Sequence, residues 1–164
     1  MALANLKDIY IDQLQDIYSA DTQAAKVTAE LAEAAHDAKL KDALNSGVEG
    51  INEGRSTLAA IIKAHGEDPA EEFCKGMEGL VKEARSHGLE EDISDPDARD
   101  AMIITQYQRM AHYGIAGYGC LVAFAKRLGL REDAAKLQKC LDATAHGDRT
   151  MTEIAEGGIN KAAA

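Results

Sequence analysis

The chain has little proline and few β-branched residues, which argues against a sheet and in favour of helices. Only two of its 164 residues are proline, while 46% of them are hydrophobic, with alanine and leucine abundant. Alanine and leucine are among the strongest helix formers, and proline is the strongest helix breaker. A chain of this length forms one domain with a sizeable core. The composition therefore predicts a single all-α domain.

The chain also lacks an excess of positive charge and any long apolar run. It has 18 basic residues against 28 acidic ones, a formal net charge of -10. Nucleic acids and anionic membrane surfaces need a basic face, which this charge disfavours. No apolar run approaches the roughly 18 residues of a membrane span, and acidic residues interrupt the N-terminal segment where a signal peptide needs an apolar core. We therefore expect a cytoplasmic protein that binds neither nucleic acid nor membrane.

Cysteine is scarce, and its spacing excludes two further classes of site. Cys74, Cys120 and Cys140 are odd in number, far apart and in no Cys-x-x-Cys arrangement. Neither a disulfide framework nor a zinc site is suggested by such a pattern. We expect all three to be reduced thiols buried in the core, where free cysteine behaves as a small hydrophobe.

Four long segments carry apolar residues at alternating spacings of three and four, the stripe of one helix face. Asp37 is a suitable N-cap for the second segment, and Asp95 followed by Pro96 starts the third. The connection between them is long enough to run from one end of a bundle to the other and contains a short amphipathic stretch over residues 77–86. The predicted long helices cover residues 3–35, 38–65, 96–128 and 131–157.

Two antiparallel helical hairpins joined by one long crossover form the connectivity of ferritin-like bundles. The chain is therefore predicted to be an all-α, ferritin-like four-helix bundle over residues 1–157, with a short helix in the crossover. The segment 158–164 continues no stripe, so we predict a flexible C-terminal tail.

At one level, every stripe is interrupted by residues that are unusual in a core. Asp21 and the pair Gly50 and Gly54 lie at matching distances on either side of the first predicted turn. The turn at Leu130 relates Ala111 and Gly114 to the segment 144–148 in the same way. All four interruptions are therefore expected to share one cross-section, at the level where a helical bundle holds a metal or a ligand.

Asp21 is the residue at this level that most needs an explanation. An unpaired carboxylate is costly to bury, so Asp21 must be neutral, paired or coordinating something. The small residues opposite it fit either a close helix crossing or a cavity, and nearby tyrosines would give a cavity hydrogen-bonding phenol groups. The predicted ligand-binding cavity consists of Asp21, Gly50, Gly54, Tyr107, Ala111, Gly114, Tyr118 and Asp148.

Four short stretches carry a resemblance that covers nearly the whole chain. They read DIYSAD at 16–21, CKGMEGL at 74–80, HYGIAGYG at 112–119 and AKRLGL at 125–130. Together they resemble the YciE/YciF family of ferritin-like bacterial proteins. The resemblance implies a four-helix ferritin-like bundle, often dimeric, that is associated with bacterial stress responses and has a carboxylate-bridged di-metal centre.

Most of the implied metal ligands are replaced in this chain. Asp21 stands where the family has a longer glutamate, and Gly50 and Gly54 stand where it has inward polar residues. Ala111 and Gly114 replace the acids of the family's Glu-His-Tyr-Glu motif. A di-iron site needs about four carboxylates and two further ligands. We therefore expect a degenerate metal site and no cofactor.

These observations leave three hypotheses open. The favoured one is a stress-associated, homodimeric protein that binds a small organic ligand or has a structural role. A second is an oxidoreductase or ferroxidase that holds iron or manganese with Asp21, Glu53, His112 and Asp148. A third is a metal-independent enzyme in which burial raises the pKa of Asp21, so that it acts as a general acid or base.

Overall fold

The computed structural model describes residues 3–164, and it confirms the all-helical class: no strand occurs among these residues. No helix of the described chain is both long and apolar enough to cross a membrane. The elements are α1 (Leu6–Ala34), α2 (Ala38–Ala64), α3 (Lys75–Arg85), the π-helical segment η1 (Ser86–Glu90), α4 (Pro96–Arg127), α5 (Arg131–Ile154), the π-helical segment η2 (Ala155–Ile159) and α6 (Asn160–Ala162).

Side-chain caps explain why several helices begin where they do. Asn5 accepts hydrogen bonds from two backbone N–H groups in the first turn of α1. Asp37 caps α2 by accepting a hydrogen bond from Leu40 N at 2.9 Å, and Asp95 caps α4 immediately before Pro96. Each cap satisfies backbone donors that have no partner inside the helix. The starts predicted from Asp37 and Asp95 are confirmed.

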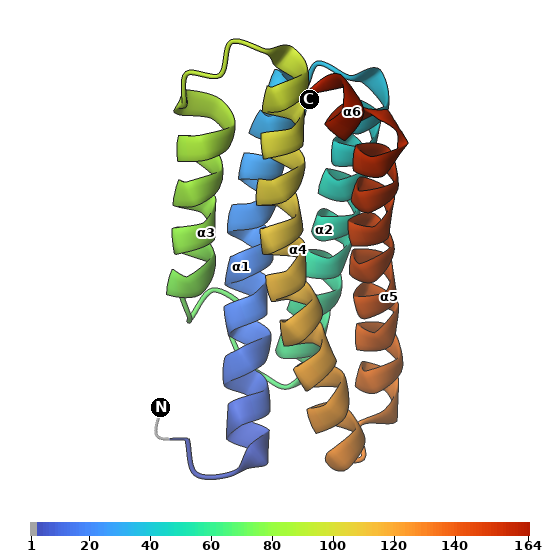
Figure 1. The fold of residues 1–164 in the computed structure, drawn as a ribbon. Helices are drawn as coiled ribbons and strands as arrows, with labels where there is room; N and C mark the ends of the chain where they lie inside the picture. The colour runs from blue at the N-terminus through green and yellow to red at the C-terminus, as the bar shows by residue number, and fades with distance from the viewer. Residues whose placement is uncertain (1–2) are drawn as a thin grey trace.

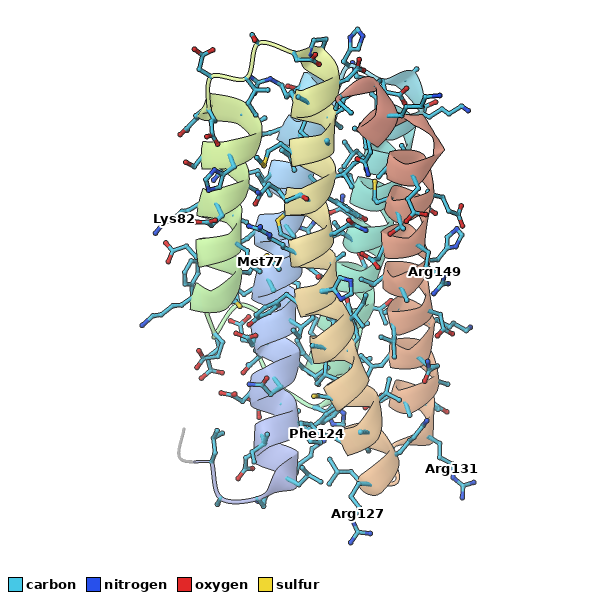
Figure 2. All side chains as sticks on the ribbon, viewed as in Figure 1. Met77, Lys82, Phe124, Arg127, Arg131 and Arg149 are labelled. Atoms are coloured by element: carbon cyan, nitrogen blue, oxygen red, sulfur yellow. The ribbon has the colours of Figure 1, made fainter. Side chains whose placement is uncertain are left out.

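The four longest helices lie side by side, as Figure 1 shows. α1 and α2 form one antiparallel hairpin, α4 and α5 form the second, and α1 packs on α4 while α2 packs on α5. The crossover between the hairpins carries the chain from one end of the long helices to the other, and it contains α3, which packs against α1 and α4. Charged side chains such as Lys82, Arg131 and Arg149 project away from the helices (Figure 2).

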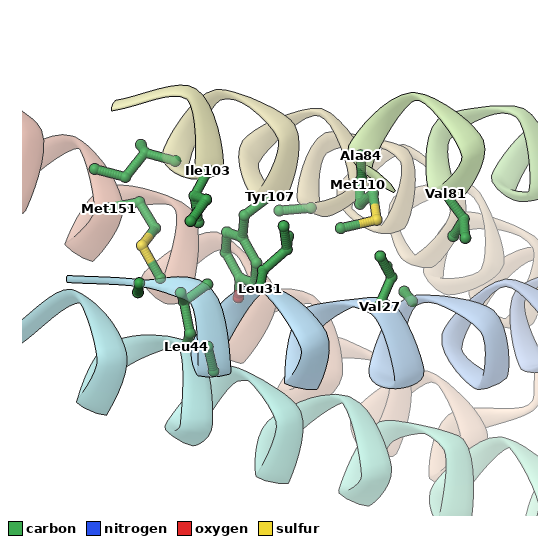
Figure 3. Close-up of a cluster of buried hydrophobic side chains, with 14 of the residues drawn as sticks. Val27, Leu31, Leu44, Val81, Ala84, Ile103, Tyr107, Met110 and Met151 are labelled. Carbon is green, nitrogen blue, oxygen red and sulfur yellow. The ribbon is translucent and has the colours of Figure 1, made fainter. Parts of the chain in front are cut away.

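The buried core is divided into two apolar clusters. One surrounds Leu31, Leu44 and Tyr107 near the turn between α1 and α2, and Figure 3 shows its interdigitated side chains. The other surrounds Leu14 and Leu121 near the opposite end of the long helices. The level of Asp21 lies between the two clusters, so the interruption in the sequence stripes corresponds to an interruption in the packed core.

The C-terminal segment 158–164, predicted as a flexible tail, forms a short helix and packs in part against the core. The backbone leaves helical geometry at Gly158, and the chain then returns to a helix that ends at Ala162. Ile159 is only 5% exposed and belongs to the same apolar cluster as Met151. The change of direction at Gly158 breaks the 3.6-residue period, which is why the stripe does not extend to Ile159 in the sequence.

The cysteines also differ from expectation. Cys74 is buried, Cys140 is half-buried, and Cys120 is exposed on α4. The prediction of three buried thiols is therefore right only for Cys74.

Candidate functional site

A cavity of about 390 Å³ lies between the long helices at the level where the apolar core is interrupted. Residues from α1, α2, α4 and α5 line it, and Met77 of α3 reaches it as well. Seven of the eight residues predicted for a ligand cavity line this space: Asp21, Gly50, Gly54, Tyr107, Ala111, Gly114 and Tyr118. The eighth, Asp148, does not.

The cavity has a closed floor and an open side. Every lining residue of α1 and α4 is buried. The exposed lining residues lie on α2 and α5, and they are Ser46, Gly50, Ala143 and His146. The mouth of the cavity is therefore between α2 and α5, and a ligand entering there would meet the α1 and α4 side chains at the bottom.

Asp21 forms the polar end of the cavity together with Tyr118. The Tyr118 hydroxyl donates a hydrogen bond of 2.6 Å to Asp21 Oδ2, and the Asp21 residue is only 8% exposed. Burial raises the pKa of Asp21 from 3.8 to about 7, while the Tyr118 hydrogen bond and the charge of Arg55 lower it. Desolvation disfavours the ionised carboxylate more than these two partners favour it. Asp21 therefore changes between its protonated and its ionised form near neutral pH.

The opposite end of the cavity presents two hydroxyl groups. Tyr107 extends from α4 between α2 and α5, and its hydroxyl lies 2.9 Å from the position of a Cβ added at Gly47 and 3.1 Å from one added at Gly147. Thr28 lies on the floor, completely buried, and its Oγ1 has no hydrogen-bond partner among residues 3–164. Buried polar atoms without partners are uncommon, and the Thr28 hydroxyl is available for a hydrogen bond from inside the cavity.

Asp148 does not line the cavity, contrary to the prediction. Its Oδ2 lies 3.1 Å from Nε2 of the exposed His112, outside the cavity lining. Gly147 occupies the inward position instead, because the Tyr107 hydroxyl needs the space that a side chain would fill there. One residue further along a helix is about 100° around its axis, which turns Asp148 away.

The alternative metal-ligand set is not brought together. Asp21 accepts a hydrogen bond from Tyr118, and Glu53 is exposed. His112 is exposed as well and pairs with Asp148, and neither of these two residues lines the cavity. Within residues 3–164, no three side chains of histidine, cysteine, aspartate or glutamate converge as metal ligands would. The donors present do not fit the carboxylate-bridged di-metal centre that the family resemblance implied.

The glycines serve two purposes, which correspond to the two explanations that the sequence left open. Gly47 and Gly54 allow close approach, because an added Cβ would lie 2.9 Å from the Tyr107 hydroxyl and 2.6 Å from the Tyr118 hydroxyl respectively. Gly50 instead borders open space, with nothing within 4 Å of an added Cβ. An added Cβ at Gly114 would meet only Thr144, at an ordinary contact distance of 3.5 Å.

This difference predicts opposite effects for two alanine substitutions one helical turn apart on α2. Gly50→Ala should raise the free energy of unfolding by about 1 kcal/mol, since alanine is the better helix former and meets no clash. Gly54→Ala should lower it by about 1–2 kcal/mol, because the methyl group displaces Tyr118 from Asp21. Urea unfolding of the two variants measures both effects. Equal shifts for the two would contradict the placement of Tyr118 against Gly54.

Sequence reasoning missed Thr28 and the inward placement of Gly147. Thr28 is seven residues after Asp21 and therefore on the same helix face, but a threonine on a stripe is normally satisfied by its own helix backbone. Only the three-dimensional contacts reveal that its hydroxyl has no partner.

The helices and the cavity define a class of all-helical proteins with an internal site between two hairpins. The chain belongs to the family described as "Domain of unknown function (DUF892)", whose model matches residues 5–164. It is 30% identical to protein YciF of Escherichia coli over 164 residues, which cover 99% of this chain and 98% of that protein. The resemblance to YciE/YciF proteins is confirmed.

Solved structures agree with this membership. The crystal structure of the E. coli stress protein YciF matches with a TM-score of 0.90 at 30% identity, covering 97% of this chain and 99% of that one. YcfI from Rhodopseudomonas palustris, described as a candidate structural protein, matches with a TM-score of 0.85 at 30% identity, covering 91% and 94%. A protein from Xanthomonas campestris shares the fold with a TM-score of 0.75 at 19% identity, covering 96% of each chain.

Proposed function

We propose that this protein is a ferritin-like, stress-associated binding protein that holds a small organic molecule at the level where such bundles hold metals. The observation that carries the proposal is the cavity beside the buried Asp21. The stress association comes from the E. coli relative, which is described as a stress protein. The ferritin-like assignment is supported by two helical hairpins joined through a crossover that runs their full length.

The size and lining of the cavity suit a small ligand. Sites for small molecules measure roughly 300–1,000 Å³ and are mainly apolar with a few convergent polar groups. The volume of about 390 Å³ lies within that range. Met110, Ile51 and Ala111 supply apolar walls, while Asp21 and Tyr107 supply polar groups at either end. Such a lining can orient a ligand by its polar groups while apolar burial provides most of the affinity.

A metal-independent enzyme is the second candidate. A general acid or base works best when its pKa is close to the operating pH. The pKa of Asp21, about 7, meets this condition, and the adjoining cavity gives a substrate access to the carboxyl group. Binding of an organic molecule at Asp21 is common to both candidates and is therefore the property to test first.

Oligomeric state and location stay predictions. We propose a homodimer in the cytoplasm, consistent with the exposed apolar side chains of Leu3, Ile9 and Phe73, which a partner subunit could cover. Sedimentation equilibrium of the purified protein tests the dimer directly, and a monomer at all concentrations would reject it.

Chemical-shift mapping tests the binding proposal on glycine amides, which are well separated in NMR spectra. We expect millimolar hexan-1-ol or p-cresol to shift the amide signals of Gly50, Gly54 and Gly114, which line the cavity. The signals of Gly66 and Gly129, in turns outside the cavity, should not move. In Gly50→Leu the added side chain covers the mouth and should abolish the shifts of Gly54 and Gly114. Failure of both probes to shift the three cavity glycines would overturn the proposal.

A further inference from the structure

The cavity has two polar ends separated by an apolar middle. Asp21 and Thr28 mark the ends on α1, and their separation of seven residues corresponds to about 10 Å along the helix. Between them lie the small or apolar side chains of Ala24, Ile51 and Ala111. A ligand that fills this space is elongated, with an apolar body and a polar group at the Asp21 end.

The polar groups at the Asp21 end call for a ligand that brings hydrogen-bond donors. Tyr118 already donates to Oδ2, and no described side chain donates to Oδ1. The cavity lining contains no lysine or arginine that could neutralise the carboxylate from inside. Arg55 acts on Asp21 by its charge from α2 but does not line the cavity. Asp21 therefore has unused capacity to accept a charge-assisted hydrogen bond.

From this geometry, and on the basis of the proposed binding function, we infer that the cavity takes a primary amine with an elongated apolar body, whose ammonium group pairs with Asp21. An ammonium group has three hydrogen-bond donors and no acceptor, which suits the end of the cavity where the Asp21 carboxylate accepts hydrogen bonds. Its charge also compensates a carboxylate that is otherwise costly to bury. The hydroxyls of Tyr107 and Thr28 at the far end can receive a second polar group of the same ligand.

The inference predicts a particular pH dependence. An ammonium ligand needs ionised Asp21, whose pKa of about 7 makes the ionised fraction rise roughly tenfold between pH 6 and pH 8. Affinity for the amine should rise by about the same factor. Affinity for a neutral alcohol should stay level or fall, because an alcohol gains no charge pairing.

Other groups that face Asp21 do not produce this change. The pKa values of the Tyr118 hydroxyl on α4 and the Cys140 thiol on α5 are both raised by burial, so both groups stay neutral in this range. Arg55 on α2 is always charged. Met77, the lining residue of α3, does not ionise. His146 lies at the rim on α5, and its contribution is separated from that of Asp21 by measuring Asp21→Asn at the same pH values.

The experiment compares hexylamine with hexan-1-ol, which has the same six-carbon chain and a neutral head group. Dissociation constants come from the shifts of the cavity glycines at pH 6, 7 and 8, in wild type and in Asp21→Asn. In wild type at pH 8 we expect hexylamine to bind at least about tenfold more tightly than hexan-1-ol, as a charge-assisted hydrogen bond provides. Asp21→Asn should remove both this preference and the rise with pH, while Gly50→Leu should block both probes.

The outcomes separate the inference from the function on which it rests. If both probes bind equally at every pH, the amine inference is overturned while the organic-ligand cavity stands. If neither probe shifts the cavity glycines, the binding function itself fails. If hexylamine shifts only acidic surface residues and spares the cavity glycines, the amine inference also fails, since the ammonium is then attracted by the net negative charge alone.

Discussion

Asp21→Asn should be more stable than the wild-type protein above pH 7, although it removes a charge from a hydrogen-bonded residue. The folded-state pKa of Asp21, about 7, lies above the ordinary value of 3.8 that the unfolded chain is expected to show. Between these values the folded state holds a proton that the unfolded state has released, so wild-type stability falls as pH rises from about 4 to 7 and then levels off. The accumulated loss is on the order of 4 kcal/mol.

Asparagine cannot ionise and still offers Tyr118 an acceptor oxygen, so the variant should not lose this free energy. Urea unfolding of both proteins between pH 4 and pH 8 measures the effect. The matched control is Asp42→Asn, which changes an exposed aspartate of α2 and should alter stability by less than about 0.5 kcal/mol. A variant that is less stable than wild type at pH 8, with an unchanged pH dependence, would refute the assignment of a costly carboxylate to Asp21.

The result would also bear on function. A residue that destabilises the fold at neutral pH is expected to serve activity, because binding and catalytic sites commonly reduce the stability of the fold in favour of function. Asp21 is buried and lines the cavity, so its cost to stability is best explained by what it binds.

Asp100→Ala should be among the most destabilising single substitutions in this chain. Asp100 is completely buried in the first turns of α4, where it accepts hydrogen bonds from His36 N at 2.8 Å and Asp37 N at 2.7 Å. These two donors belong to the turn between α1 and α2, so the carboxylate holds the first hairpin to the start of the second. Alanine leaves both backbone donors without a partner, and we expect a loss of about 3 kcal/mol.

Thermal unfolding checks this prediction, and a loss of this size should lower the melting temperature by about 10 °C. The matched control is Asp92→Ala, in the exposed loop that precedes α4, which should leave the melting temperature nearly unchanged. If the two variants melt within a degree or two of each other, the turn does not depend on Asp100.

The sequence predicts the long helices well because two local signals agree. Apolar periodicity sets the face of each helix, and Asp37 and Asp95 provide starts that need no tertiary contact. Asp100 shows the limit of such reasoning. Its partners are the backbone groups of a turn more than 60 residues away, so no local pattern distinguishes it from Asp97, the other acid in the first turns of α4.

The level of the cavity is also readable from the sequence, because four interruptions of the stripes mirror one another about the two turns. The sequence does not decide which of two adjacent residues points inward at that level. Gly147 and Asp148 are adjacent, and the Tyr107 hydroxyl decides between them by occupying the space beside Gly147. That the Thr28 hydroxyl has no hydrogen-bond partner likewise follows from how the helices pack, and no sequence pattern predicts it.

The most direct test of an organic-ligand cavity in place of a metal centre is a crystal structure of this protein, expressed with added iron, purified without chelators and grown with hexylamine. Diffraction data collected at the iron absorption edge locate any bound iron independently of the ligand. We predict density for the amine between the long helices, its nitrogen within hydrogen-bond distance of Asp21 Oδ1, and no anomalous peak beside it. Two anomalous peaks about 3.5–4 Å apart at the Asp21 level would contradict the proposal and restore a di-metal centre.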